Sequence, residues 1–201
     1  MATPSLEFWY EFASTYSYLA ASRIEALAAA RNVTVQWRPF LLGPIFAAQG
    51  WTTSPFNIFE AKGRNMWRDM ERQTAAAGLR LVRPSAFPRN GLLPARVAMI
   101  GATEDWGPTF TRAVYHANFA EDRDIADAAV IHSILRELNL PADQILERAQ
   151  GAENKEALKQ QTTRAIELGL FGAPSFTVGH ELFWGNDRLE QALDWAASHP
   201  A

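Results

Sequence analysis

The fold of this chain is decided by the stretch Leu6-Glu7-Phe8-Trp9-Tyr10-Glu11-Phe12-Ala13-Ser14-Thr15-Tyr16-Ser17-Tyr18-Leu19. Its first half, residues 6–12, alternates in the manner of a β-strand. From Thr15 to Arg31 the apolar side chains then recur near helical spacing. Ser14 lies at the junction, where the first turn of a helix offers unpaired N–H groups and the positive end of the helix dipole. The pattern therefore predicts a strand, a turn and a helix whose N-terminus favours an anion.

Two roles are open to Ser14. Serine is a preferred N-cap residue, because its oxygen accepts a hydrogen bond from an N–H group of the first helical turn. Its hydroxyl can also donate a hydrogen bond to a bound anion such as a thiolate. The roles are compatible, since the hydroxyl can cap the helix in the absence of a ligand and rotate when a thiolate binds.

The chain contains no cysteine. Ser14 and Ser17 stand at the positions where a thioredoxin-type fold carries Cys-x-x-Cys. The protein therefore cannot carry out disulfide chemistry by itself, and any sulfur chemistry requires a thiol brought by a ligand. We expect this ligand to be glutathione.

Composition excludes several classes of protein. The 201 residues suit one domain, or one domain with a large insertion, and the 48% hydrophobic and 20% charged fractions are typical of a globular protein. A net charge of −3 provides no basic field for nucleic acid or an anionic membrane. Neither a membrane span nor a secretory signal is recognisable, so we expect a cytoplasmic protein. The four histidines lack ligand spacing, so we predict no metal.

The remaining pattern gives a βαβ unit, a long helical stretch and a closing ββα unit. A second strand is predicted at residues 33–37, and residues 44–169 are almost entirely helical in pattern. We expect helices at about 57–78, 92–103, 108–120, 125–138 and 155–168, with a short one opened by Pro141. Capping signals are expected at Asn57 and Asp124, and a C′ residue at Gly169.

The C-terminal segment predicts a strand at residues 173–178, a turn at Gly179-His180, a strand at 181–184 and a helix at 187–198. The whole order predicts an α/β fold: a thioredoxin-like domain, residues 1–43 and 170–201, interrupted by an all-helical insertion at residues 44–169.

Two further stretches qualify as parts of a site. Pro174 opens a strand, where its missing N–H group is tolerated, and from the residues alone a trans bond before it is expected. Asp187 and Glu190 fit a capping box, which by itself would explain the aspartate. Asn186 and Asp187 at a helix N-terminus would also suit the α-amino group of a γ-glutamyl moiety.

These stretches together resemble the 2-hydroxychromene-2-carboxylate isomerases and the kappa-class glutathione transferases, which belong to the DsbA-like branch of the thioredoxin superfamily. The resemblance covers nearly the whole chain, and its specificity lies in the joint order and spacing of the motifs. The matching stretches are Phe12-Ala13-Ser14-Thr15-Tyr16-Ser17-Tyr18-Leu19-Ala20, Arg38-Pro39-Phe40, Ala61-Lys62-Gly63, Phe171-Gly172-Ala173-Pro174 and Trp184-Gly185-Asn186-Asp187-Arg188.

The resemblance implies roles for individual residues toward bound glutathione. Ser14 would meet the glutathione sulfur and act as the catalytic residue. The backbone at Ala173 and a cis-Pro174 would pair with the cysteinyl part. Asn186 and Asp187 would hold the γ-glutamyl end, and Lys62 would lie near the glycyl carboxylate. The resemblance also implies a homodimer acting in the degradation of aromatic compounds.

The chain departs from the family pattern at two places. Thr15 stands where the family usually has proline, and threonine also tolerates the first helical turn. Gly50-Trp51 stands where the family often has Gly-Asn. If that asparagine contacts glutathione, then either Asn57 replaces it or the contact is missing.

The implied activity is a glutathione-dependent isomerase that interconverts a hydroxychromene carboxylate and trans-o-hydroxybenzylidenepyruvate. The alternatives are a kappa-like glutathione transferase acting on an unknown electrophile and a non-catalytic thioredoxin-fold protein that binds a peptide or a thiol. Arg89, Asn90 and Arg96 are candidates to meet a substrate carboxylate. Candidates for an apolar wall against an aryl ring are Trp51, Phe56, Trp67 and Phe87, although large aromatic residues more often belong to the core.

Overall fold

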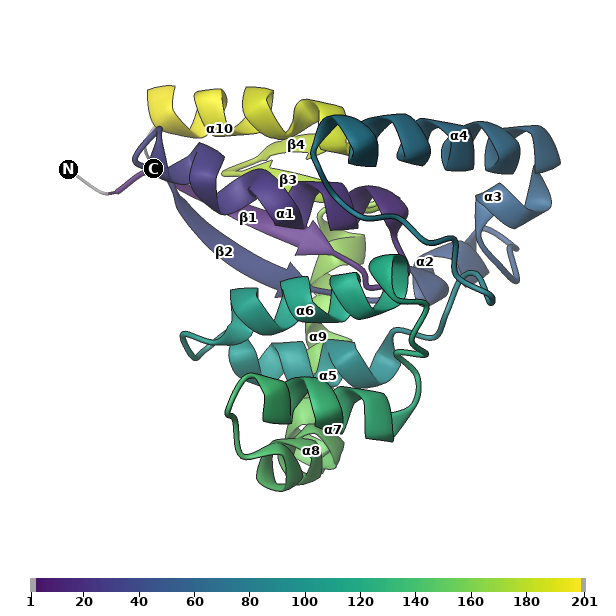
Figure 1. Ribbon diagram of the computed structural model, residues 1–201. Helices are drawn as coiled ribbons and strands as arrows, with labels where there is room; N and C mark the ends of the chain where they lie inside the picture. Colours follow the sequence, from purple (N-terminus) through teal and green to yellow (C-terminus); the bar gives the residue numbers. More distant parts are fainter. Residues whose placement is uncertain (1–2, 200–201) are drawn as a thin grey trace.

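The computed structural model describes residues 3–199 and is built around a four-stranded mixed sheet (Figure 1). The strands are β1 (Ser5–Tyr10), β2 (Thr34–Pro39), β3 (Ser175–Val178) and β4 (Glu181–Trp184), in the spatial order β2-β1-β3-β4. β1 pairs with β2 in parallel, whereas β3 is antiparallel to both β1 and β4. The predicted α/β fold, with a βαβ unit and a closing ββα unit, is confirmed.

Alternation along β1 explains why it is a central strand. Phe8 and Tyr10 face the larger core, and Phe8 packs between Trp37 of β2 and Phe176 of β3, with ring centroids 5.0 and 5.5 Å away. Trp9 points to the opposite face and belongs to a second apolar cluster that includes Phe40. Period-two alternation thus buries both faces of the strand.

The helices cover both faces of the sheet. In Figure 1, α1, α10 and α4 lie above the sheet and the green helices below it. Their bounds are α1 (Thr15–Ala29), α2 (Leu42–Ala48), α3 (Pro55–Ile58), α4 (Glu60–Ala76), α5 (Leu92–Gly101), α6 (Gly107–Ala120), α7 (Ala128–Glu137), α8 (Ala142–Gln150), α9 (Ala152–Glu167) and α10 (Leu189–Ser198), with a 3₁₀ turn at Asn186–Arg188. Among residues 3–199, no helix has the length and apolarity needed to cross a bilayer.

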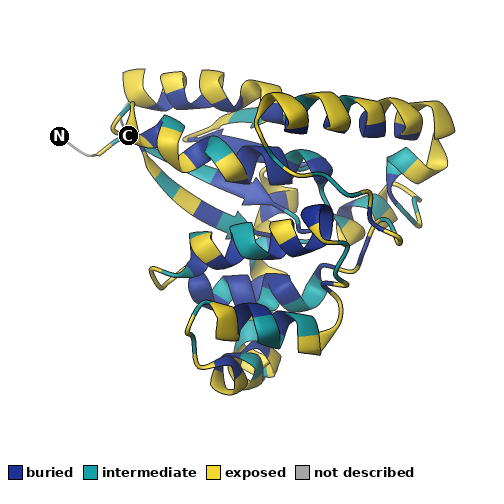
Figure 2. Cartoon of the chain, viewed as in Figure 1, coloured by how far each residue is buried: buried dark blue, intermediate teal, exposed yellow. Residues whose placement is uncertain are grey.

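The helical segment shares a core with the sheet. Phe8 of β1, Tyr18 of α1 and Tyr115 of α6 belong to one buried cluster, and α1 packs against α6. Dark blue segments occur in the sheet, in α1 and in the helices below it (Figure 2). The division into a thioredoxin-like domain and an insertion at residue 44 therefore stays a prediction about chain organisation.

Two predicted helix starts were wrong. Asn57 opens no helix: it lies inside α3, which Ser54 caps by accepting a hydrogen bond from the Phe56 N–H group at 3.3 Å, and α4 begins at Glu60 without a side-chain cap. α7 is capped by Asp127 rather than Asp124. Both aspartates accept a hydrogen bond from a backbone N–H group two residues later, so the sequence alone does not distinguish the turn from the cap.

The prediction at the end of α9 was correct. Gly169 has φ of +76° directly after the last turn, as expected for a C′ residue. β1 ends at Tyr10, two residues earlier than predicted, because Glu11 begins a turn. The Glu11 carboxylate accepts a hydrogen bond from the Ala13 N–H group at 2.9 Å, and its carbonyl accepts one from the Ser14 N–H group at 3.0 Å.

Candidate functional site

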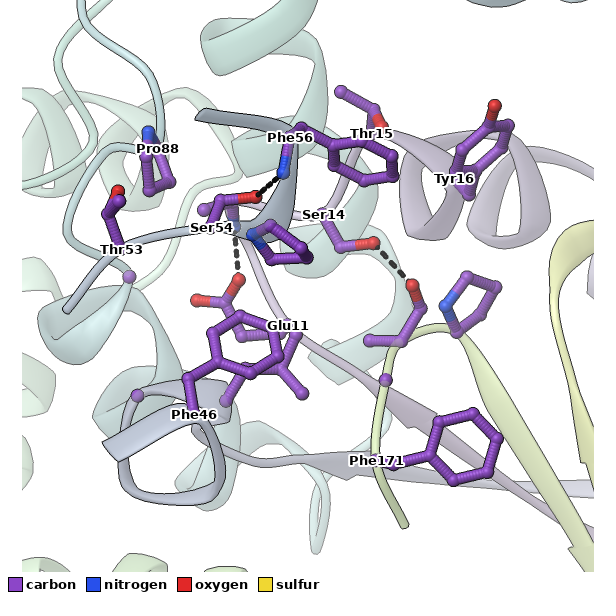
Figure 3. A pocket seen from close by; sticks show the side chains of 18 of the residues that line it. Glu11, Ser14, Thr15, Tyr16, Phe46, Thr53, Ser54, Phe56, Pro88 and Phe171 are labelled. Carbon is purple, nitrogen blue, oxygen red and sulfur yellow. Dashed lines mark hydrogen bonds between the residues drawn. The ribbon is translucent and has the colours of Figure 1, made fainter. Parts of the chain in front are cut away.

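A cleft with a volume of about 1390 Å³ lies at the N-terminus of α1 (Figure 3). Its walls come from the loop before β3, the turn before α10, α2 and the segment after it, α3, one face of α4, and residues 87–92. The walls therefore combine segments that are far apart in the sequence. The cleft brings together Ser14, Lys62, Ala173, Pro174, Asn186 and Asp187, which are the six residues predicted to bind glutathione.

Ser14 is the N-cap of α1, as one of its two predicted roles requires. Its Oγ accepts a hydrogen bond from the Ser17 N–H group at 3.2 Å and donates one to the Ala173 carbonyl at 2.8 Å. Within residues 3–199, the N–H groups of Thr15 and Tyr16 have no hydrogen-bond partner. The helix end therefore presents free donors and its positive dipole to the cleft beside the hydroxyl.

The loop before β3 faces Ser14. The Ala173–Pro174 bond is cis, as the resemblance implied, and the Pro174 carbonyl accepts a hydrogen bond from the Gly185 N–H group at 2.9 Å. In the described part of the chain, the N–H group of Ala173 has no partner. One backbone donor is thus available next to the Ser14 hydroxyl.

An aromatic pair flanks this loop. The rings of Phe171 and Trp184 meet edge to face with centroids 4.9 Å apart, and both side chains are about half exposed. A Cβ atom at Gly172 would overlap the indole nitrogen of Trp184. Glycine is therefore required at position 172 for the aromatic side chain to lie across the loop.

The predicted capping box at Asp187 is wrong. Neither the 3₁₀ turn nor α10 has a side-chain cap, and the Asp187 side chain is 77% exposed. Glu190 instead forms an ion pair with Arg23 at 2.7 Å. The 3₁₀ turn before α10 displaces Asp187 from the capping position, so helix capping does not account for this aspartate at the cleft wall.

Asn186 is buried and holds three elements together. Its Oδ1 accepts a hydrogen bond from Arg23 of α1 at 3.2 Å, and its Nδ2 donates one to Gln73 of α4 at 3.0 Å. Both functional ends of the amide are thus engaged by the protein. Asn186 fixes the turn before α10 and thereby the position of Asp187.

Tyr16, Asp69 and Gln73 also line the cleft, and the sequence analysis did not assign them to the site. Asp69 accepts hydrogen bonds from the Tyr16 hydroxyl at 3.0 Å and from Gln73 at 2.6 Å. Burial would raise the pKa of Asp69, but hydrogen bonds from Tyr16, Arg72 and Gln73 outweigh it and lower that pKa. Asp69 is therefore a stable carboxylate near Asp187. The i,i+4 spacing of Asp69 and Gln73 on one helix face was the available signal.

Glu11 is a further cleft residue that the sequence analysis did not assign. Desolvation raises the pKa of its carboxyl group to about 7, and the hydrogen bond from the Ala13 N–H group lowers it only in part. A Cβ atom at Gly91 would lie 2.5 Å from the Glu11 Oε1, so the glycine leaves room for this carboxyl group.

Some of the residues predicted to contact the substrate or the glycyl carboxylate of glutathione line the cleft, and others belong to the core. Trp51, Phe56, Phe87, Asn90 and Lys62 line the cleft. The Lys62 ammonium lies 4.7 Å from the centroid of the Phe59 ring. Asn90 is exposed, and its Oδ1 accepts a hydrogen bond from the Leu92 N–H group at 2.9 Å.

Trp67 and Asn57 do not line the cleft. Trp67 is buried and packs edge to face against Phe87 at 5.0 Å, so it belongs to the core. Asn57 donates hydrogen bonds to the Thr53 hydroxyl at 3.2 Å and the Phe87 carbonyl at 2.9 Å. Its amide therefore ties α3 to the loop at residue 87, so Asn57 does not replace the family's asparagine at the cleft, where Trp51 lies instead.

Arg89 borders the cleft, but its guanidinium group is directed into the protein. It is buried, forms an ion pair with Asp122, and donates hydrogen bonds to Asn118 Oδ1 at 3.1 Å and to the Arg123 carbonyl at 2.9 Å. These contacts hold the segment at residues 87–92 on α6. The geometry supports a structural role for Arg89 rather than contact with a substrate carboxylate.

Comparison with known proteins places the whole chain in one family. The DSBA-like thioredoxin domain matches residues 5–195. The chain is 27% identical over 188 residues to the 2-hydroxychromene-2-carboxylate isomerase of Sphingobium xenophagum, covering 94% of this chain and 95% of that protein. It is 24% identical to glutathione S-transferase kappa 2 of Caenorhabditis elegans, covering 96% and 91% of the two chains.

Solved structures agree on the fold. A 2-hydroxychromene-2-carboxylate isomerase structure superposes with a TM-score of 0.85 at 24% identity, covering 96% of this chain and 94% of that one. The cytosolic disulfide reductase DsbM of Pseudomonas aeruginosa, solved with GSH, has a TM-score of 0.67 at 17% identity and covers 96% of each chain. The extent of the family match, together with the sheet topology, establishes that this chain belongs to the DSBA-like thioredoxin domain family.

Proposed function

We propose that this protein is a glutathione-dependent isomerase that interconverts a hydroxychromene carboxylate and trans-o-hydroxybenzylidenepyruvate. The observation that carries the proposal is the placement of a serine hydroxyl, free helix N–H groups and the free N–H group of Ala173 around one point of the cleft. Similarity to named 2-hydroxychromene-2-carboxylate isomerases over nearly the whole chain supports the choice of reaction.

The residues of the cleft fit glutathione. The N–H group of Ala173 and, once the Ser14 hydroxyl turns away, its carbonyl would pair with the cysteinyl backbone. The exposed Asp187 carboxylate, with Asp69 nearby, suits the α-amino group of the γ-glutamyl end. Lys62 of α4, which also lines the cleft, would approach the glycyl carboxylate. Asn186 would act through the turn that it fixes.

The chain has the means to favour a thiolate. A free thiol has a pKa near 8.5 and is mostly protonated at neutral pH. The dipole of α1, the N–H groups of Thr15 and Tyr16, and the Ser14 hydroxyl all stabilise negative charge at this point. When bound, glutathione supplies a nucleophile that adds reversibly to a conjugated carbon, allows the former double bond to rotate, and is regenerated.

The proposal is tested by mixing the pure protein with glutathione and the ring-opened hydroxychromene carboxylate and following the absorbance of the trans product. The account predicts turnover that depends on glutathione while the total thiol stays constant. Isomerisation at the rate of glutathione alone would contradict it.

A kappa-like glutathione transferase is the second candidate, favoured by the similarity to the Caenorhabditis elegans kappa enzymes. It would use Ser14, Pro174 and Asp187 in the same way but would consume glutathione, so loss of thiol in the same assay identifies it. Calorimetry that detects binding of an extended peptide and no binding of glutathione would instead support a non-catalytic binding protein.

A cytoplasmic homodimer remains our expectation, and sedimentation of the purified protein tests the dimer.

A further inference from the structure

Glu11 differs from the other carboxylates of the cleft. Asp69 receives hydrogen bonds from three side chains, Tyr16, Arg72 and Gln73, and Asp187 is exposed to solvent near Arg188. Glu11 has one donor, the Ala13 N–H group at 2.9 Å, and among residues 3–199 no ion-pair partner within 4 Å. Its carboxyl group is therefore the least stabilised as an anion.

The position of Glu11 places it at the substrate half of the cleft. Figure 3 shows the Glu11 carboxyl group and Phe46 to one side of Ser14 and Phe171 of the proline loop to the other, and all four residues line the cleft. The same half is bordered by Trp51, whose ring centroid is 5.6 Å from that of Phe46. An aryl substrate beside a thiol held at Ser14 would occupy this half.

The surrounding charged and titratable groups leave the Glu11 carboxyl group without a compensating cation. Tyr115 of α6 donates its hydroxyl hydrogen to the Glu11 carbonyl at 2.9 Å. Arg89 is bound to Asp122 and Asn118, and Lys62 lies over Phe59 on α4. Burial raises the pKa of Glu11 to about 7, so both protonation states are populated near neutral pH.

We propose that Glu11 is the catalytic acid and base that donates a proton to the substrate's ketone oxygen and takes it back. As the carbon–sulfur bond forms, the electron pair of the conjugated double bond moves to the ketone oxygen, which takes the proton from the Glu11 carboxyl group. After rotation, the Glu11 carboxylate removes that proton while the carbon–sulfur bond breaks and the double bond returns. The proton, the electron pair and the thiolate are all restored, as an isomerisation requires. This inference rests on the proposed function.

The test compares Glu11→Gln with the wild type. Glutamine keeps the size of the side chain and an oxygen for the Ala13 N–H group, but it has no proton to transfer. We expect turnover at saturating glutathione to fall about 100-fold or more, while calorimetry gives a glutathione dissociation constant within about twofold of the wild type. Glu156→Gln, at an exposed position on α9, is the matched control and should leave turnover unchanged.

Two further measurements separate catalysis from structure. In the wild type, isomerisation of the saturated complex should decline as pH rises through about 7, because the acid is lost. Isotope-edited NMR of labelled glutamate should show one carboxyl resonance titrating near that pH, which is missing in Glu11→Gln. If Glu11→Gln fails to fold, the pH dependence of the wild-type rate and the titrating carboxyl resonance of the wild type decide whether Glu11 acts as the acid and base.

The outcomes are distinct. Turnover of Glu11→Gln within threefold of an active wild type, or a wild-type rate that does not decline above pH 7, would overturn the role of Glu11 and leave the proposed isomerase standing. A wild type without glutathione-dependent isomerisation would overturn the proposed function, and the role of Glu11 with it.

Discussion

The Ser14 hydroxyl and the Ala173 carbonyl form a 2.8 Å hydrogen bond that joins the start of α1 to the loop before β3. One residue thus caps the helix and closes the gap to the cis-proline loop. The same bond occupies the hydroxyl proposed to meet the thiol of glutathione and the carbonyl proposed to pair with its cysteinyl backbone. If glutathione binds as proposed, it must therefore replace this hydrogen bond.

Asp187→Ala separates binding from helix stability. Because Asp187 caps no helix and is largely exposed, its loss should leave the melting temperature within about 1 °C of the wild type. The concentration of glutathione for half-saturation should rise about tenfold, with a smaller effect on the saturated rate. Glu167→Ala, at an exposed position on α9 outside the cleft, is the control for a general change in surface charge. Unchanged glutathione affinity in Asp187→Ala would remove it from the site.

Gly172→Ala tests the packing of the proline loop. The added methyl group would overlap the indole nitrogen of Trp184, so the loop or the indole must move. We expect a loss of about 1–3 kcal/mol in the free energy of unfolding, together with weaker glutathione binding. Gly43→Ala is the matched control, because a Cβ atom there meets no heavy atom within 4 Å. Equal urea midpoints for the two variants would show that the loop adapts freely.

The Glu11 carboxyl group should make stability depend on pH. Its folded-state pKa of about 7 lies above the ordinary value of 4.5, so the folded protein binds the proton more tightly than the unfolded chain. Stability should therefore decrease as pH rises from about 4.5 to about 7, by roughly 3 kcal/mol in total, because each unit of pKa difference corresponds to about 1.4 kcal/mol. Urea unfolding of the wild type and Glu11→Gln across this range measures the effect as a difference between the two proteins. A constant difference would contradict the raised pKa.

Asp69→Asn tests the network behind the site. The substitution removes the carboxylate that accepts hydrogen bonds from Tyr16 and Gln73 and would leave the γ-glutamyl amine with Asp187 alone. We expect glutathione to bind about three- to tenfold more weakly. Glutathione lacking the α-amino group should bind the wild type and the variant equally. If the wild type and Asp69→Asn still bind that analogue with different affinities, Asp69 affects binding through the structure of the site and not through contact with the amine.

Local pattern was sufficient to predict most of the fold. The alternation of residues 6–12, the helical spacing after Thr15 and the glycine at position 169 each reflect a local physical preference. Each predicted element is present, although the strand ends at Tyr10 rather than at residue 12. The helix starts at Asn57 and Asp124 were wrong because several residues in those segments have equal capping ability, and tertiary packing chooses among them.

The site was less predictable than the fold. Ser14 and Pro174 could be found because helix ends and prolines leave a clear signature in sequence. Glu11 carries no such signature, and Asp69 has only its i,i+4 spacing to Gln73, since their environment depends on Gly91, Tyr16 and other residues that only folding brings near. Arg89 illustrates the opposite case, because an arginine that looks available in sequence is bound by Asp122 in the folded chain.

The pKa of the thiol of bound glutathione tests the central claim most directly. Ultraviolet absorbance of the thiolate, titrated against pH in the saturated complex, reports this pKa for the wild type and for Ser14→Ala. The variant loses the cap, at about 1 kcal/mol of stability, and the hydroxyl donor, but it keeps the helix dipole and the N–H groups of Thr15 and Tyr16. The account predicts a wild-type value at least about one unit below the ordinary thiol value near 8.5, and a higher value in the variant. A thiol pKa near 8.5 in both proteins would contradict the claim that this helix end activates glutathione.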